Sequence, residues 1–384
     1  MKVLQVSKFY PPHHGGIEAV ARDLSAGLVA RGVAVEVLCA NKRLRHADDV
    51  DASGVRITRA ASAGLLLSTS MAPGLLPQLR ARRQQADIVH VHMPDPLAAL
   101  AVWYARPAGR VVLHWHSDVV RQRLARHVYQ PLERWLLQRA DAIIATSAPY
   151  AQSSPTLQPW LHKVRVVPLG APPPQPAQPR LVEEARRRYG GRRIVFSLGR
   201  LTYYKGFDVL VQAARLLPDD VVVVVGGGGP ELARFRALAQ QHGVAERVRF
   251  IGPMSAARVE AHFAAAELFC LASTVRAEAY GVVVLEAMAR GLPVVASRIP
   301  GSGLNWLHQD GVTGLAVPPG DAPALAAAIN RLLADAALRR QFGHAGQARW
   351  AAGLTAQTMS DLILDLYRDL LALPPAGTDH ESPP

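Results

Sequence analysis

Residues 171–179 read Ala-Pro-Pro-Pro-Gln-Pro-Ala-Gln-Pro, so five of these nine residues are proline. Proline lacks a backbone N–H and has a fixed φ, and this density excludes the interior of a helix or a sheet. The stretch therefore predicts a semi-rigid, extended linker. A chain of 384 residues is also too long for one ordinary hydrophobic core. We predict two domains, residues 1–170 and residues 180–355, on either side of the linker at 171–179.

Short runs rich in β-branched residues alternate with helical patterns before the linker. A helix is expected at 17–31, where Val20, Leu24 and Leu28 form one apolar stripe that ends at Gly32. Such alternation is typical of a parallel sheet with helices on both faces. The expected strands are residues 2–7, 33–40, 55–59, 87–92, 110–114, 142–146 and 164–168.

The same alternation restarts after the linker. The fold class is therefore α/β, with two Rossmann-like, doubly wound domains that face each other across a cleft. Ligands of such sheets bind at the carboxyl ends of the strands. A last helix within 356–373 is expected to cross back to the N-terminal domain, and the Pro-rich tail at 374–384 to be disordered. The expected strands are residues 193–198, 221–225, 248–251, 268–271, 294–296 and 314–317, and the clearest helices are 322–333 and 358–373.

The positive charge of the chain is unevenly distributed. Of the net +13, +10 lies in residues 1–179 and +3 in residues 180–384. Arginine supplies 38 of the 43 basic residues in an alanine-rich chain, so genomic base composition accounts for part of the excess under one interpretation. The others are nucleic acid, an anionic membrane surface or a phosphorylated ligand. Aromatic residues make up only 6% and no nucleic-acid-binding motif is visible, so we expect no nucleic-acid partner.

Composition and cysteine usage narrow the class of protein further. Hydrophobic residues make up 49% and charged residues 19%, which excludes intrinsic disorder and collagen-like fibres. Cys39 and Cys270 lie in separate apolar runs, which predicts buried thiols in a reducing compartment and no disulfide. No signal peptide or membrane-spanning run is visible, so we expect a cytoplasmic protein.

Two motifs in the C-terminal half indicate a phosphate-containing ligand. Glu278-Ala-Tyr-Gly-Val-Val-Val-Leu-Glu286 places one carboxylate in a loop and another on a helix that begins near Gly281. The amides at that helix N-terminus suit an anion, whereas the alternative is an amphipathic helix with two exposed glutamates. Upstream, Arg200 and Lys205 follow a strand in a glycine-bounded loop, where two cations suit a diphosphate. The alternative for that pair is two ordinary surface residues.

Together these motifs resemble the donor half of the retaining glycosyltransferases of family 4, which have the GT-B fold. The resemblance rests on Arg200, Lys205, the Glu278-x7-Glu286 pair and the following Gly291-Leu-Pro-Val-Val. Residues 11–18, Pro-Pro-His-His-Gly-Gly-Ile-Glu, resemble the family's first glycine loop. Residues 112–118, Val-Leu-His-Trp-His-Ser-Asp, resemble the segment that supplies a histidine near the sugar, here His116.

The resemblance implies roles for individual residues in binding a nucleotide sugar. Arg200 and Lys205 would neutralise the leaving diphosphate, Glu278 would hold sugar hydroxyls, and Glu286 would bind the ribose. His116, Glu278, Arg200 and Lys205 would then form the catalytic set. Further donor contacts are expected from the backbone at Gly16, Tyr280, Gly281, Val282 and Val283, and beside the base at Gly252 and Pro253.

Acceptor contacts and metal dependence follow from the same resemblance. We assign the acceptor to His13, His14, Trp115 and Asp118. Many members have glycine where this chain has Ala279, which leaves the hexose open. No covalent nucleophile is evident, so front-face displacement with retention is expected, and no metal or cofactor, since Arg200 and Lys205 supply the positive charge.

Histidines and glycines form two further patterns. His90-Val-His92 and His114-Trp-His116 are i,i+2 pairs on strands, so each pair faces one side of the sheet. With His13 and His14 they could bind zinc, but contacts to sugar and phosphate or packing are favoured. The glycine run at 226–229 is interpreted as a tight turn into a helix, because it lacks the spacing of a phosphate-binding loop.

Within the family, the chain resembles bacterial GDP-mannose-dependent α-mannosyltransferases of xanthan- or acetan-type exopolysaccharide assembly. That resemblance implies a GDP-sugar donor and a lipid-linked acceptor, a polyprenyl-diphosphate cellobiose. The alternatives are a rhamnosyl- or UDP-sugar-dependent transferase of O-antigen or glycolipid synthesis, or another GT-B enzyme such as a phosphorylase or epimerase.

Such an acceptor would explain the basic N-terminal half. We expect the protein to lie on the inner face of the cell membrane as a peripheral protein. Residues 64–85 mix leucines with Arg80, Arg82 and Arg83, and residues 119–139 are a second basic amphipathic segment. The alternative for either segment is a core-facing helix with a solvated basic face.

Overall fold

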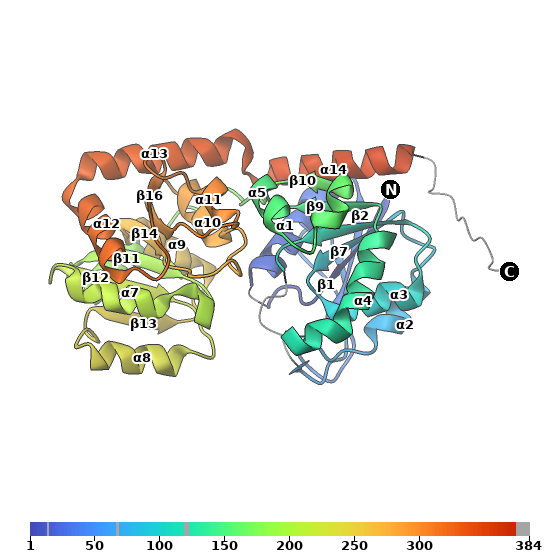
Figure 1. Ribbon diagram of the computed structural model, residues 1–384, viewed down its shortest axis with the longest axis horizontal. Coiled ribbons are helices and arrows are strands. Elements are labelled where there is room, and N and C mark those ends of the chain that lie inside the picture. Colours follow the sequence, from blue (N-terminus) through green and yellow to red (C-terminus); the bar gives the residue numbers. More distant parts are fainter. Residues whose placement is uncertain (14, 67–68, 119–122, 374–384) are drawn as a thin grey trace.

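The computed structural model describes residues 1–13, 15–66, 69–118 and 123–373. Two α/β domains lie side by side along the long axis of the molecule (Figure 1). The N-terminal domain is built on an eight-stranded sheet and the C-terminal domain on a six-stranded sheet. A two-stranded hairpin, β5 (Leu65–Leu66) with β6 (Thr69–Ser70), projects from the first domain.

The N-terminal sheet is parallel except at one edge. Buried β-branched residues fill its central strands, as expected of strands covered on both faces. Only β3 runs antiparallel, against β4, and the sequence pattern missed this strand because three of its four residues are exposed. In spatial order the strands are β10 (Val164–Val166), β9 (Ala142–Ala145), β8 (Arg110–Trp115), β7 (Ile88–Met93), β1 (Lys2–Ser7), β2 (Ala34–Ala40), β4 (Arg56–Ala60) and β3 (Ala47–Val50).

Helices cover both faces of this sheet. On one face α1 (Gly16–Val29) buries the stripe Val20, Leu24 and Leu28, as its spacing predicts. On the other, α3 packs between α2 and α4. Asp95 caps α3 by accepting a hydrogen bond from the amide of Leu97. The helices of this domain are α1, α2 (Leu75–Ala81), α3 (Pro96–Ala105), α4 (Arg123–Arg139) and α5 (Ala148–Ser153).

The C-terminal sheet is entirely parallel among the described residues. Its six strands match the six predicted ranges to within one residue at either end. In spatial order they are β13 (Val248–Gly252), β12 (Val221–Gly226), β11 (Arg193–Leu198), β14 (Leu268–Leu271), β15 (Val294–Ser297) and β16 (Gly314–Val317). The helices are α6 (Pro179–Arg188), α7 (Phe207–Ala213), α8 (Leu232–Gln241), α9 (Ala256–Ala265), α10 (Val282–Ala289), α11 (Leu304–Leu307), α12 (Ala322–Ala334) and α13 (Ala336–Gly353).

The chain passes between the domains twice, and the two passages are hydrogen-bonded to each other. The amide of Ala171 donates to the carbonyl of Leu354 at 3.0 Å, and the amide of Ala356 donates back to Ala171 at 2.9 Å. A Cβ on Gly170 would lie 2.1 Å from the carbonyl oxygen of Thr355, so only glycine allows this approach. The hinge is thus a short ladder rather than two independent strands of chain.

The last helix, α14 (Ala356–Ala372), lies on the N-terminal domain, although α13 before it lies on the C-terminal domain (Figure 1). It packs along α1, where Nε of Arg31 is 2.5 Å from Oδ1 of Asp361. Its Tyr367 is fully buried and its hydroxyl is 2.6 Å from Nδ1 of His90. Residues 374–384, for which we predict disorder, lie outside the described residues.

Apolar residues are buried in layers on either side of each sheet. One core cluster spans both domains, from α1 and α14 through the hinge to α9 and α10. The faces covered by α2–α4 and by α7, α8 and α12 form separate clusters. Cys39 and Cys270 are free and fully buried, as predicted. Among the described residues, no helix is both long and apolar enough to cross a membrane.

Candidate active site

Each sheet contains one place where the chain leaves adjacent strands in opposite directions. In the C-terminal domain this lies between β11 and β14, and in the N-terminal domain between β1 and β7. Loops diverge beyond such strands and leave a crevice at their carboxyl ends. Arg200 and Lys205 follow β11, and Glu278 follows β14. The topology therefore brings the motifs of the C-terminal half together, although they are more than 70 residues apart in sequence.

Lys205 and Glu278 form a buried ion pair. The lysine Nζ is 2.6 Å from Oε2 of Glu278, and the two side chains are only 9% and 6% exposed. Ser273 also donates to Oε2 at 2.8 Å. Burial opposes the charge of Lys205, but the adjacent carboxylate and its hydrogen bond outweigh it, so the pKa of this lysine is raised. Both charges are thus fixed in place before any ligand arrives.

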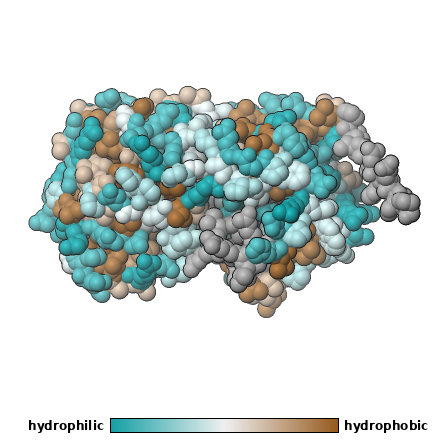
Figure 2. Space-filling view, in the orientation of Figure 1, coloured by the Kyte–Doolittle hydropathy of each residue, from teal (hydrophilic) through white to brown (hydrophobic). Residues whose placement is uncertain are grey.

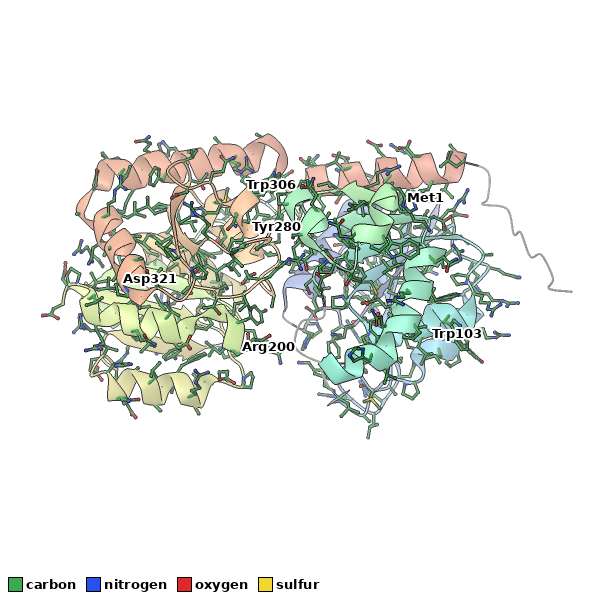
Figure 3. The ribbon with its side chains drawn as sticks, viewed as in Figure 1. Met1, Trp103, Arg200, Tyr280, Trp306 and Asp321 are labelled. Carbon is green, nitrogen blue, oxygen red and sulfur yellow. The ribbon has the colours of Figure 1, made fainter. Side chains whose placement is uncertain are left out.

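Arg200 differs from Lys205 because it is exposed and faces the N-terminal domain (Figure 3). Its loop is held by the glycine run after β12. The amide of Leu201 donates to Gly228 at 2.9 Å, and a Cβ on Gly227 would lie 2.1 Å from the carbonyl oxygen of Gly199. The glycines therefore allow two backbones to meet closely, which agrees with a tight turn and places Arg200 at the edge of the cleft.

The N-terminus of α10 lies beside these cations. Gly281 caps the helix with φ +88°, and a Cβ there would lie 2.7 Å from Leu304. The amides of Val282 and Val283 belong to the first turn, where the helix offers them no acceptor. Tyr280 cannot reach the cleft with its ring, because this side chain is 3% exposed and its hydroxyl donates to the carbonyl of Leu169. Only the backbone of Tyr280 remains as a candidate contact, as we expect.

The glycine loop of the N-terminal domain faces this helix end. A Cβ on Gly16, at the start of α1, would lie 4.0 Å from Cγ2 of Val282. Burial raises the pKa of Glu18 in the same turn, and the charges of Lys8, Arg200 and Lys42 act in the opposite direction. Glu18 of one domain and Arg200 of the other are therefore close enough to interact across the cleft.

Glu286 is half-buried on α10, and its carboxylate has no hydrogen-bond partner among the described residues. Burial raises its pKa to about 7, with Arg290 acting against the shift and Asp23 and Glu260 adding to it. An unpartnered acceptor at the cleft is suited to a pair of ligand hydroxyls. Gly252 ends β13 and Pro253 begins the loop after it. The amide of Gly227 donates to the carbonyl of Gly252 at 2.8 Å.

Four histidines form a buried cluster behind the cleft. The i,i+2 pairs do face one side of the sheet, because the rings of His90 and His92 are 4.8 Å apart and those of His114 and His116 are 4.3 Å apart. His116, at the end of β8, is 7% exposed, and the other three are essentially inaccessible. Burial lowers the pKa of His90 and His116 to about 3, and those of His92 and His114 fall well below the ordinary value. All four are therefore neutral at physiological pH.

Hydrogen bonds fix how these neutral rings are protonated. Oε1 of Gln5 accepts from Nε2 of His92 at 2.9 Å, which leaves Nδ1 of His92 as an acceptor. That nitrogen lies 2.9 Å from Nε2 of His116, so His116 donates there and retains a lone pair on Nδ1. Sequence reasoning found the histidines but missed Gln5, because only the pairing of β1 with β7 places Gln5 beside them.

Three of these histidines also form a candidate metal site. His90, His92 and His114 each offer one nitrogen, and these atoms lie within 4.8 Å of one another. Hydrogen bonds already use several of these nitrogens, since Nε2 of His90 lies 3.2 Å from Nδ1 of His114 and Nδ1 of His90 meets Tyr367. His13 lies elsewhere, 4.0 Å from Glu18 on the glycine loop, and His14 is outside the described residues.

Two residues that we assign to the acceptor are buried and contact other parts of this chain. Asp118 is 9% exposed, accepts hydrogen bonds from Trp115 and Ser154, and lies 2.5 Å from Arg276 of the opposite domain. Trp115 is fully buried. Asp118, Tyr150 and Arg276 form an interdomain clasp, in which the Arg276 guanidinium stacks 4.2 Å above the Tyr150 ring. The motif was visible in the sequence, but its partner Arg276 was not.

Two facing doubly wound domains with an ammonium–carboxylate pair, an exposed guanidinium and helix amides at the cleft define the GT-B class of nucleotide-sugar enzymes. The sequence matches the family model Glycosyltransferase Family 4 over residues 14–175 and the model Glycosyl transferases group 1 over residues 182–349. Together the two models match all residues except 1–13, 176–181 and 350–384.

Curated relatives extend over nearly the whole chain. O-antigen chain mannosyltransferase C of Escherichia coli is 32% identical over 97% of this chain and 99% of its own. The D-rhamnosyltransferase WbpZ of Pseudomonas aeruginosa is 32% identical over 93% of both chains. A GDP-mannose-dependent alpha-(1-6)-phosphatidylinositol monomannoside mannosyltransferase of Mycobacterium tuberculosis is 31% identical over 94% of this chain and 98% of its own.

Among solved structures, Anabaena HepE in complex with UDP-glucose matches with a TM-score of 0.80 and 21% identity over 96% of this chain and 100% of that one. This likeness shows the fold. The chain belongs to the group 1 and family 4 glycosyltransferases of the GT-B fold. It is a glycosyltransferase of glycan or glycolipid synthesis.

Proposed function

We propose that this glycosyltransferase moves α-mannose from GDP-mannose to a saccharide carried on a polyprenyl diphosphate, with retention of configuration. The observation that carries the proposal is the convergence of Lys205, Glu278 and the α10 N-terminus opposite Gly16. The named activities of two relatives, mannosyl transfer in both and GDP-mannose dependence in one, support the donor.

In this proposal the donor lies along the C-terminal side of the cleft. Its diphosphate would lie against Arg200, Lys205 and the amides of Val282 and Val283. The free carboxylate oxygen of Glu278 would accept hydrogen bonds from the hexose, while Oε2 stays engaged with Lys205 and Ser273. Glu286 would bind the ribose, and Gly252-Pro253 would lie beside the base.

The proposed chemical step is front-face displacement at the anomeric carbon. The bond between that carbon and the diphosphate oxygen breaks, the acceptor oxygen bonds to the same face, and the leaving phosphate takes the acceptor proton. Arg200 and Lys205 would stabilise the charge that develops on the diphosphate. His116 would contact the sugar through its neutral Nδ1, since its pKa is about 3 and it carries no charge. We expect no dependence on a divalent metal, so transfer should persist in EDTA.

The relatives favour O-antigen or glycolipid assembly over the exopolysaccharide setting that the sequence suggests. Rhamnosyl transfer is the second candidate, because one relative with the same identity is a rhamnosyltransferase. Ala279 is 6% exposed beside the sugar site, where its methyl group would narrow the space for the hexose.

A transfer assay tests the proposal directly. GDP-mannose, GDP-rhamnose and UDP-glucose should be supplied in turn with polyprenyl-diphosphate mono- and disaccharides, and the product anomer determined by NMR. We expect GDP-mannose to give the highest kcat/KM and an α-linked product. A β-linked product would overturn retention, and a preference for GDP-rhamnose would favour the second candidate.

We further propose that the protein binds an anionic membrane surface, but through residues that differ from those expected. Arg82 is held by Glu36 at 2.6 Å and by Thr58 at 3.1 Å, so it is not free to meet lipid. Arg80 is exposed and its guanidinium lies 5.1 Å from the ring centre of Tyr104, while Arg83 is half-buried. The exposed apolar side chains of the neighbouring segments are Leu65, Leu66, Met71, Trp103 and Tyr104.

Arg80 is on α2, Trp103 and Tyr104 are on α3, Leu65 and Leu66 are on β5, and Met71 directly follows β6. Helix α3 contacts both α2 and β6. In Figure 3, Trp103 lies on the side of the N-terminal domain remote from the other domain. On the face of the molecule that Figure 2 shows, apolar residues are distributed among polar ones. A mixture of exposed aromatic rings and arginine suits a lipid headgroup region.

Vesicle sedimentation tests this surface. Arg80→Glu combined with Trp103→Ser should reduce binding to phosphatidylglycerol vesicles at least tenfold. The first substitution removes electrostatic attraction to the anionic lipid, and the second removes apolar area that lipid would bury. The control is Arg165→Glu, which removes the same charge from an exposed residue on β10. Equal binding by the double variant and the control would remove this surface from the proposal.

A further inference from the structure

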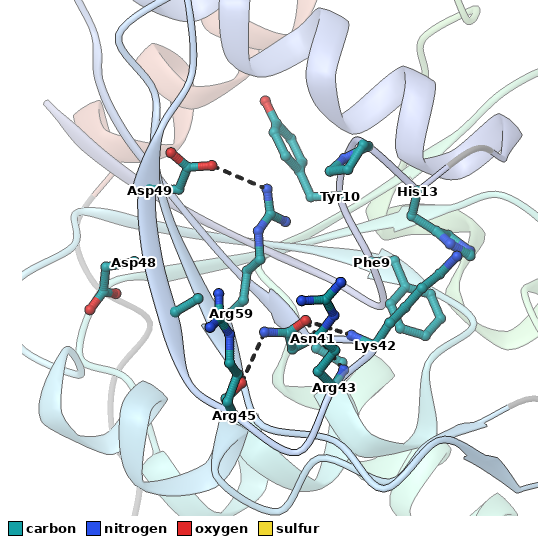
Figure 4. Close-up of a pocket in the computed structure, with 13 residues that line it drawn as sticks. Phe9, Tyr10, His13, Asn41, Lys42, Arg43, Arg45, Asp48, Asp49 and Arg59 are labelled. Carbon is teal, nitrogen blue, oxygen red and sulfur yellow. Dashed lines mark hydrogen bonds and ion pairs between the residues drawn. The ribbon is translucent and has the colours of Figure 1, made fainter. Parts of the chain in front are cut away.

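A cavity of about 470 Å³ opens on the N-terminal domain, apart from the side chains that form the donor site. It lies at the carboxyl ends of β1, β2 and β4 and is walled by a turn that follows β2 (Figure 4). The chemistry-bearing residues that line it are Tyr10, His13, Asn41, Lys42, Arg43, Arg45, Asp48, Asp49 and Arg59. We call it the basic pocket.

Asn41 shapes the turn that carries three of the cations. Its side-chain oxygen accepts hydrogen bonds from the amides of Lys42, at 2.8 Å, and Arg43, at 3.3 Å. Its side-chain nitrogen donates to the carbonyl of Arg45 at 2.9 Å. This turn leaves the side chains of Lys42, Arg43 and Arg45 exposed around one cavity.

The acids in the pocket do not neutralise these cations. Asp48 accepts from Thr58 at 2.8 Å and meets His46 at 2.9 Å, which lowers the pKa of its carboxyl group. Asp49 is 3.9 Å from Arg59 (Figure 4). Within the described part of the chain, no carboxylate pairs with Lys42, Arg43 or Arg45. A concave surface with three unpaired cations is suited to a polyanion.

The basic pocket and the glycine loop of the N-terminal domain share His13. This loop leads to Gly16, which lies opposite Val282. Lys42 of the pocket and Arg200 of the donor site both act on the pKa of Glu18. His116 follows β8, and three strand spacings in this sheet separate β8 from β2, or about 14 Å. A short saccharide, but not a single sugar, could span that separation.

We propose that the basic pocket binds the diphosphate that joins the acceptor saccharide to its lipid, with Arg43 and Arg45 as the principal contacts. The proposal rests on the proposed function and adds a site for the anionic part of the acceptor. We do not assign the donor diphosphate to this pocket. Its proposed contacts lie on the opposite domain and are Arg200, Lys205 and the amides of α10. An arginine guanidinium can donate two parallel hydrogen bonds to phosphate oxygens. The ammonium group of Lys42 is a compact charge and cannot bind in this bidentate way.

The decisive variant is the double substitution Arg43→Gln/Arg45→Gln, with Arg165→Gln as the matched control on exposed β10. Two acceptors are compared, a disaccharide on a short-chain prenyl diphosphate and the same disaccharide on a neutral alkyl aglycone. The double variant should raise KM for the diphosphate acceptor at least tenfold, because it loses charge-assisted hydrogen bonds. Its KM for the neutral acceptor and for the donor should match those of the control. An equal rise for both acceptors, or none, would overturn the proposal.

A binding experiment separates this site from the proposed reaction. With GDP saturating the donor site, inorganic pyrophosphate and farnesyl diphosphate are titrated calorimetrically into the full-length protein. We expect both to bind the control, and the double variant to bind each at least tenfold more weakly. If pyrophosphate alone binds, the ligand is a free phosphate compound and not the lipid carrier. If no sugar is transferred yet this loss occurs, the anion site stands and the proposed function fails. Unchanged binding of both probes to the double variant would overturn the site itself.

Discussion

The two domains hold their cations in opposite ways. In the C-terminal domain, Lys205 is 9% exposed and already paired with Glu278 at 2.6 Å. In the N-terminal domain, Lys42, Arg43 and Arg45 are exposed around an open pocket. A buried pair is rigid but leaves a costly charge if one partner is lost, whereas exposed cations cost little until a ligand orders them. The cation of the C-terminal domain is therefore positioned in advance, whereas those of the N-terminal pocket would be ordered only by a ligand.

Breaking the buried pair should give the largest effect. Lys205→Met removes a charge next to the leaving diphosphate and leaves Glu278 buried without its partner, so kcat should fall about 10²- to 10³-fold and Tm should drop. Steady-state kinetics and thermal unfolding measure the two effects separately. The double variant Lys205→Met/Glu278→Leu should recover Tm but not kcat. Recovery of activity with Tm would show that the pair only stabilises the fold.

The histidine cluster refines the comparison between the two domains, because hydrogen bonds already position these N-terminal side chains without a ligand. His92→Phe removes the acceptor that orients His116, and kcat should fall roughly 10- to 100-fold with the donor KM unchanged. Tyr367→Phe is the control, since it deletes a hydrogen bond at the other end of the cluster, on His90. If both variants lose turnover equally, the cluster acts through stability and not through His116.

Substitution of Glu286 should give the smallest of these effects. We expect it as a change in the pH dependence of donor binding. The Glu286 pKa of about 7 means that the ionised carboxylate, the better acceptor for ribose hydroxyls, becomes the main form only above that pH. The Kd for GDP-mannose should therefore fall several-fold between pH 6 and pH 8, and Glu286→Gln should remove this dependence. Calorimetric titration across that range measures it, and a dependence that persists in the variant would assign it to another group.

The raised pKa of Glu286 also predicts how the stability of the fold changes with pH. A carboxyl group whose pKa is higher in the folded protein than its ordinary 4.5 holds its proton more tightly when folded. Its contribution to the free energy of unfolding is complete below pH 4.5 and is lost as the pH rises through about 7. Glu286→Gln should consequently flatten the decline of Tm between these two pH values.

The sequence predicts the strands well because parallel, doubly covered strands are uniformly apolar, as the valines of β12 illustrate. It could not predict β3, whose residues are mostly exposed, or the side chains that act across elements. Arg276 and Gln5 carry no local signal, since their partners lie 158 and 87 residues away. Asp118 was visible in its motif, but its pairing with Arg276 across the cleft was not. The pocket around Arg43 likewise depends on β2 lying between β1 and β4.

The paired passages of chain at Ala171 and Thr355 have a consequence for motion. Two covalent connections that are hydrogen-bonded side by side resist torsion about the long axis of the molecule, yet permit bending across their common plane. Any opening of the cleft would then follow one path, in which the clasp of Asp118 and Arg276 separates while the backbone near Gly170 stays in contact with Thr355. A single path of opening would lower the entropy lost on each closure, and the two halves of the site would then meet in the same register.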